Sequence, residues 1–311
     1  MTIFMYIFCL LVWGLNFIAV KIQGTPISLE VSLTYRIAGA ALLFVILACL
    51  YRPSGRPSRR DTLPIIIFGA CNFALSYLLL YYGTIWSSAA LVTLMFSMKA
   101  ILTPIALRVF LGERLHLRIL IGGIIGMIAV CIVIYPLLSE QFNLAQLKGV
   151  GVALLGTLLT SVGDASSARN ANRGINPVYS NSFGGVVAAL LLFIICTFQG
   201  QDFYLPTSIS YLGALVWLTV FASFVAWMFY LKLVERIGAS LSSYMVALFP
   251  AIGGIASVII RDSQPTLYLF FGCLFGCIGA AIAMGLRFPF PSNRSDKKVK
   301  QHQLYSDKKV N

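Results

Sequence analysis

Ten apolar stretches, each about 20 residues long, dominate this sequence of 311 residues. They lie at residues 3–22, 30–50, 63–82, 87–109, 117–137, 147–168, 177–198, 209–231, 239–260 and 266–287. A helix of about 20 residues crosses the roughly 30 Å hydrocarbon core of a bilayer. Because apolar residues are continuous rather than alternating, the stretches predict spanning helices and not β-strands. We therefore expect an all-α integral membrane protein with ten transmembrane helices.

The composition agrees with a membrane protein. Apolar residues make up 59% of the chain and charged residues only 11%, and the mean hydropathy is +0.88. A water-soluble domain of this length needs far more charge to cover its surface. The lipid bilayer is therefore the expected partner, with the chain a monomer or homodimer. The basic tail 288–311 is expected to be disordered and cytoplasmic.

The net charge of +13 is distributed in a way that favours a membrane orientation over nucleic-acid binding. With the N-terminus in the cytoplasm, 18 of the 23 Lys and Arg residues fall on the cytoplasmic side. The other side holds only Lys21, Lys148 and Arg261, while Arg36 and Lys99 lie within spans. By the positive-inside rule, both termini are predicted to be cytoplasmic.

The two halves of the chain share a sequence pattern about 150 residues apart. Ser88–Leu91 corresponds to Gly238–Leu241, and the pair Gly122 and Gly126 corresponds to Gly272 and Gly276. We expect a first repeat at residues 1–138, a linker at 139–146 and a second repeat at 147–287. Five spans in each repeat would insert the second copy inverted relative to the first, an arrangement typical of transporters.

Two segments resemble a known family. Val12–Lys21 is similar to the first helix of EamA-type members of the drug/metabolite transporter superfamily, and Phe110–Leu115 is similar to the "LGER" signature at the end of their fourth helix. The resemblance covers residues 3 to 287. It implies ten helices in two inverted five-helix repeats around a central cavity, and export of amino acids, related metabolites or drugs. The chain departs from the family pattern at Ile260–Ser263, where the second signature is degenerate, and at Ala100, opposite Pro250.

Lys99 is the strongest candidate for a substrate-binding residue. It lies about 12 residues into its span, roughly 18 Å from the outer end at 1.5 Å per residue. A cation at that depth usually faces a cavity or a partner. We expect Lys99 to bind an anionic group such as a substrate carboxylate; the alternative is a structural ion pair or a hydrogen bond to backbone carbonyls.

Asp164 is the only carboxylate deep within a span and a candidate for proton coupling. Burial raises the proton affinity of a carboxylate and a nearby cation lowers it, so such a group is tunable. The alternative is that it simply pairs with Lys99 or Arg169.

Arg36 lies about two turns inside the outer end of the second span. It is expected either to extend to the interface or to line an outer vestibule near Glu30. Amide and aromatic residues within spans are candidates for the cavity wall, although aromatic residues equally suit interfacial belts or helix packing. These candidates are Asn16, Asn72, Tyr77, Tyr81, Trp227, Tyr230, Asn181 and Tyr244.

The sequence lacks the residues that an enzyme or a nucleotide-driven pump needs. The only histidines are His116, at a helix end, and His302, in the tail, and no phosphate-binding loop is present. Cys273 and Cys277 share a helix face without a neighbouring ligand, so packing is favoured over metal binding. We expect no enzyme activity, cofactor or metal. The expected function is export of amino acids or related metabolites across a bacterial inner membrane. The alternatives are export of cationic or lipophilic drugs, uptake of a metabolite, or a sensor or scaffold role.

Overall fold

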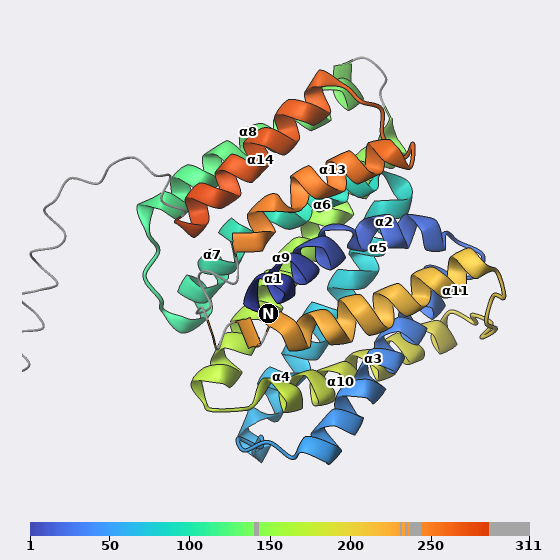
Figure 1. Ribbon diagram of the computed structural model, residues 1–311, viewed down its shortest axis with the longest axis vertical. Coiled ribbons are helices and arrows are strands. Elements are labelled where there is room, and N and C mark those ends of the chain that lie inside the picture. The colour runs from blue at the N-terminus through green and yellow to red at the C-terminus, as the bar shows by residue number, and fades with distance from the viewer. Residues whose placement is uncertain (140–142, 231, 234–235, 237–243, 286–311) are drawn as a thin grey trace, which may run out of the picture.

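The structure, a computed structural model, describes residues 1–139, 143–230, 232–233, 236 and 244–285. Within these ranges all regular structure is helical, as expected (Figure 1). Residues 140–142 of the 139–146 linker, the segment Gly238–Leu241 and the basic tail 288–311 lie outside the described residues.

Within the described residues, each of the ten apolar stretches contains one or more helices. In chain order they are α1 (Thr2–Gly14), α2 (Asn16–Gln23), α3 (Leu29–Tyr51), η1 (Arg59–Asp61), α4 (Thr62–Phe68), η2 (Gly69–Leu75), α5 (Ser76–Trp86), α6 (Ala89–Ser97), α7 (Lys99–Leu111), α8 (Leu117–Ser139), α9 (Leu144–Asn172), α10 (Pro177–Phe198), α11 (Ile209–Val216), η3 (Trp217–Val225), η4 (Tyr244–Leu248), α13 (Phe249–Ile259) and α14 (Leu267–Met284).

Among the described residues, eight helical segments are long and apolar enough to cross a membrane. A ninth results if α1 and α2, which meet at a bend of 43°, form one span. The remaining apolar helix, Met245–Ile259, is shorter. The expected boundaries differ from the observed ones by a few residues; the third stretch, for example, continues to Trp86 instead of ending at 82.

Several helices are irregular near their middles. The segments η2 and η3 are π-helical, and such insertions occur frequently at functional sites. The break between α6 and α7 at Met98 has a counterpart 150 residues later, where α13 begins after Leu248. Pro250 therefore lies in the first turn of α13, where no helical hydrogen bond is lost.

Helices of the first half pack against helices of the second half. The main contacts join α2 with α11, α3 with α10, α5 with α9, α6 with α13, and α8 with α14, the last pair lying side by side in Figure 1. Glycine allows the close approach of α8 and α14, because a Cβ atom at Gly279 would lie 2.8 Å from the Gly122 carbonyl oxygen. Small residues promote such packing in lipid.

Candidate functional site

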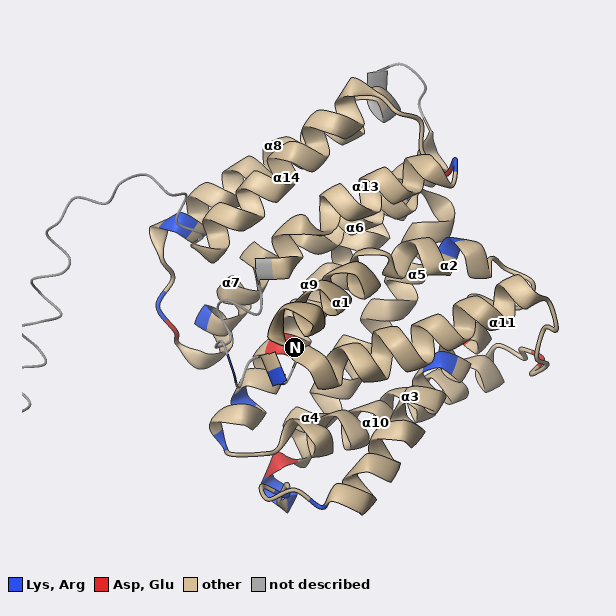
Figure 2. Cartoon of the chain, viewed as in Figure 1, with Lys and Arg blue, Asp and Glu red and all other residues tan. Residues whose placement is uncertain are grey.

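Charged residues are sparse along the helices and gather near helix ends (Figure 2). The described part of the chain contains three ion pairs: Lys99 with Asp164, Lys21 with Asp262, and Arg173 with Asp61. The first lies inside the helical bundle, and the other two lie at helix ends.

Lys99 is the first residue of α7, immediately after the break at Met98. Its ammonium nitrogen lies 2.9 Å from Oδ2 of Asp164 on α9, and 5.5 Å from the ring centroid of Phe96. The two side chains are only 23% and 17% exposed. Lys99 thus has the ion-pair partner that the sequence left open as an alternative to an anionic substrate.

The Asp164 carboxylate has two further partners. Asn72 of η2 donates a hydrogen bond of 3.0 Å to Oδ1, and Thr103 of α7 donates one of 2.9 Å to Oδ2. Gly163 allows Asn72 to approach Asp164, because a Cβ atom at position 163 would lie 2.8 Å from Cβ of Asn72. Three segments that are distant in sequence therefore converge on one carboxylate. We call Lys99, Asp164, Asn72 and Thr103 the central pair cluster.

A second polar cluster surrounds Arg36. The side chain is 1% exposed, so it does not extend to the surface. Its Nε donates to the Ser223 hydroxyl at 3.0 Å, one terminal nitrogen to Asn16 Oδ1 at 3.0 Å, and the other to the Tyr81 hydroxyl at 3.3 Å. The Tyr77 ring lies 4.7 Å from the guanidinium carbon. We call these five residues the Arg36 cluster.

An aromatic group adjoins the Arg36 cluster. Trp227 contacts the rings of Trp13, Tyr230 and Phe73, with centroids 5.6, 5.9 and 6.3 Å away. Phe73 in turn contacts Tyr77, below Arg36. The Trp13 indole nitrogen donates to the carbonyl of Ala222 at 2.9 Å, which ties α1 to η3.

The candidates from the sequence are thus divided between the clusters. Asn72 lies in the central pair cluster, Asn16 and Tyr81 lie in the Arg36 cluster, and Trp227 lies in the aromatic group. Tyr244 begins η4, and its side chain lies outside the described residues. Glu30 does not pair with Arg36; its carboxylate accepts from the hydroxyl of Tyr82.

Two hydroxyl residues were missed as candidates: Thr103 and Ser223. Serine and threonine are common in membrane helices, where the side-chain hydroxyl usually donates to the backbone carbonyl four residues earlier. Thr84 and Thr93 do so here. Only the π-helical character of η3 marks Ser223 as unusual, and this character is not visible in the sequence.

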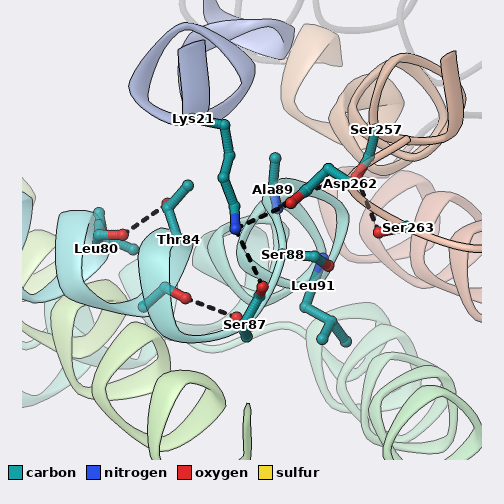
Figure 3. A network of polar contacts seen from close by, with 11 residues as sticks. Lys21, Leu80, Thr84, Ser87, Ser88, Ala89, Leu91, Ser257, Asp262 and Ser263 are labelled. Carbon is teal, nitrogen blue, oxygen red and sulfur yellow. Dashed lines mark hydrogen bonds and ion pairs between the residues drawn. The ribbon is translucent and has the colours of Figure 1, made fainter. Parts of the chain in front are cut away.

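A third cluster joins the ends of α2, α6 and α13 (Figure 3). The Lys21 ammonium lies 2.9 Å from Oδ1 of Asp262 and donates to the Ser87 carbonyl at 3.3 Å. The other carboxylate oxygen accepts from the backbone N–H of Ala89 at 2.7 Å and from the Ser257 hydroxyl at 2.9 Å. Asp262 therefore caps α6, where a carboxylate is stabilised by the helix dipole. We call Lys21, Asp262, Ala89 and Ser257 the helix-end clasp.

Two apolar grooves lie apart from these clusters. One, of about 420 Å³, follows α11 and η3 from Ile209 to Phe221, and the other, of about 440 Å³, lies between α3 and α10. Neither is lined by Arg36, Lys99 or Asp164.

Comparison with known proteins identifies the family. The model of the EamA-like transporter family matches residues 1–135 and 166–285. The chain belongs to this family. The chain is also 22% identical over 282 residues to an "Uncharacterized transporter" of Archaeoglobus fulgidus, covering 88% of the chain and 95% of that protein.

A solved structure described only as "Crystal structure of protein" shares the fold, with a TM-score of 0.64 and 19% identity. The match covers 92% of this chain and 98% of the other. Together, the family membership and the apolar helices support a multi-pass membrane transporter.

Proposed function

We propose that this EamA-like protein is a secondary transporter that exports amino acids or related small metabolites by alternating access, coupled to protons. The observation that carries the proposal is the pair of Lys99 and Asp164, 2.9 Å apart and largely enclosed by helices. Charges are costly within a membrane and mark substrate or proton pathways there.

The geometry of the central pair cluster supports proton coupling. Protonation of Asp164 would cancel its charge and release Lys99, which could then bind an anionic group of the substrate. Asn72 and Thr103 would hold the carboxyl group in both protonation states, since each donates to an ionised oxygen and the amide also offers an acceptor. In this scheme the Asp164 carboxylate and the anionic group of the substrate compete for Lys99, and a proton on Asp164 favours the substrate.

The proposed architecture is ten spans in two inverted repeats. It is supported by the recurrence of a helix break at Met98 and Leu248, and of a π-helical segment at η2 and η3. Packing between the halves also supports it. The first span of each proposed repeat contacts the third span of the other, in the pairs α2 with α11 and α9 with α5. With both termini cytoplasmic, the helix-end clasp faces the outside and must open whenever the cavity opens outward.

Flux through reconstituted vesicles tests the proposal. Purified protein in proteoliposomes is assayed with radiolabelled amino acids, purines and cationic dyes, with and without a pH gradient. We expect amino-acid flux that increases when the gradient is imposed. Lys99→Met should abolish this flux, and Asp164→Asn should retain exchange but lose its response to the gradient.

The controls distinguish the alternatives. Preferential flux of dyes would indicate a drug exporter, and absence of any flux from well-folded protein would indicate a sensor or scaffold. Arg59→Gln, an exposed change at a helix end, should leave flux unchanged. Normal, gradient-dependent transport by both Lys99→Met and Asp164→Asn would rule out the proposed role of the pair.

A further inference from the structure

Arg36 is a fully buried cation that lacks a counter-charge in the described part of the chain. Among the described residues, no carboxylate oxygen lies within 4.0 Å of it, whereas Lys21 and Lys99 each pair with an aspartate. The nearest acidic residue along α3 is Glu30, whose carboxylate bonds Tyr82 instead. All hydrogen-bond partners of Arg36 are neutral: an amide, a phenol and an aliphatic hydroxyl.

A buried charge without a counter-charge is unfavourable, so this arrangement requires an explanation. The guanidinium has five N–H groups, of which these three hydrogen bonds use one at each nitrogen. Two N–H groups therefore remain, one on each terminal nitrogen. These two terminal nitrogens form the fork that a carboxylate matches with two parallel hydrogen bonds.

A second polar group without a partner lies on the segment that contacts Arg36. Thr219 precedes Ser223 on η3 by about one turn, and its buried hydroxyl has no hydrogen-bond partner among the described residues. It lies against α3, because a Cβ atom at Gly39 would come within 2.8 Å of its methyl carbon. Gly39 follows Arg36 by about one helical turn, so the Thr219 side chain packs on the side of α3 from which Arg36 projects.

We infer that Arg36 is the binding site for the carboxylate group of the transported substrate. The inference rests on the proposed transport function and names the group by which the substrate is recognised. Lys99 is available to the substrate only after Asp164 is protonated, because the ionised carboxylate pairs with it, whereas Arg36 is available in both states. One available cation matches the single negative charge of a carboxylate, whereas a doubly charged phosphate would need a second cation.

Two of the segments that contact Arg36 have an irregular backbone. Asn16 begins α2 at the 43° bend after Leu15, and Ser223 lies in the π-helical segment η3. Both partners are thus carried by segments that can rearrange without unwinding a regular helix. The Tyr81 hydroxyl, at 3.3 Å the most distant of the three acceptors, is the one that a carboxylate would displace first.

The test compares carboxylates with their uncharged amides. The twenty amino acids, lactate and benzoate, each with its primary amide, are screened for thermal stabilisation of the purified protein and for flux in proteoliposomes. We expect at least one carboxylate to bind, with its amide about 10- to 100-fold weaker, as the loss of a hydrogen bond to a charged group predicts. Arg36→Gln should remove this preference, and Arg36→Lys should keep part of it.

The controls separate binding from folding and from transport. Arg52→Gln, an exposed arginine at the end of α3, should bind like the wild type. If Arg36→Gln does not fold, Arg36→Lys is compared with the wild type instead. The lysine retains the positive charge but lacks the two parallel N–H groups of the guanidinium. Equal binding of acid and amide, or an unchanged preference in the folded variants, would overturn the inference. Transport of dyes or purines, but of no carboxylate, would overturn the inference about Arg36 while supporting a transport function. Absence of flux for every solute would contradict the proposed transport function itself.

Discussion

At the scale of single residues, the Lys99–Asp164 pair is a structural interaction as well as a functional candidate. Asp164→Asn leaves the Lys99 ammonium without a counter-charge, so we expect a lower melting temperature in detergent. Breaking a fully buried pair costs about 3–5 kcal/mol, and the partial exposure of these side chains places the expected loss below that. Thermal unfolding monitored by tryptophan fluorescence measures it.

The matched control is the double variant Lys99→Met with Asp164→Asn, which removes both charges. Because the remaining groups are neutral, the double variant should recover part of the stability that Asp164→Asn alone loses. If the double variant loses as much stability as the two single variants combined, the two charges do not stabilise each other.

At the scale of helices, two glycines of α9 are predicted to differ sharply. A Cβ atom at Gly163 would lie 2.8 Å from Asn72 Cβ, whereas nothing lies within 4 Å of one at Gly151. Gly163→Ala should therefore separate α9 from η2, stretch the bond between Asn72 and Asp164, and reduce both melting temperature and flux. Gly151→Ala should be neutral or stabilising by up to about 1 kcal/mol, since alanine favours helix. Equal effects of the two changes would contradict the close contact.

The helix-end clasp is the second prediction at this scale. Asp262→Asn removes the charge partner of Lys21 and weakens the cap of α6, so we expect a loss of about 1–2 kcal/mol, typical of a helix cap. Asp202→Asn is the control, because this aspartate is exposed in the loop after α10. A melting temperature of Asp262→Asn equal to that of the control would show that the clasp contributes no stability.

At the scale of the whole molecule, the distribution of basic residues predicts a specific topology. Residues 51–62 should face the cytoplasm and the loop 199–208 the outside. Single cysteines introduced at Ser54 and Thr207, in a background without the native cysteines, test this in intact cells with a membrane-impermeant maleimide. We expect labelling at position 207 and protection at position 54. The reverse pattern would invert the orientation and place the helix-end clasp in the cytoplasm.

The amino-acid sequence by itself determined the class of this protein, because hydrophobic length is a local property. Runs of about 20 apolar residues specify helices that can cross a membrane wherever they occur, and the helices found over stretches such as 177–198 coincide with them. The resemblance of Val12–Lys21 and Phe110–Leu115 to the EamA family is likewise a property of short segments, and the family is confirmed.

Only the tertiary structure decided which polar residues meet. Lys99 and Asp164 were each recognisable as unusual, but their pairing depends on how α7 rotates against α9. Arg36 meets Asn16, Tyr81 and Ser223 because four segments converge around it. Within the described part of the chain it pairs with no carboxylate, and Glu30 of the same helix bonds Tyr82 instead. An apolar span can rotate about its axis with little change in its pattern, so packing between helices, and not hydropathy, selects the face of each polar side chain.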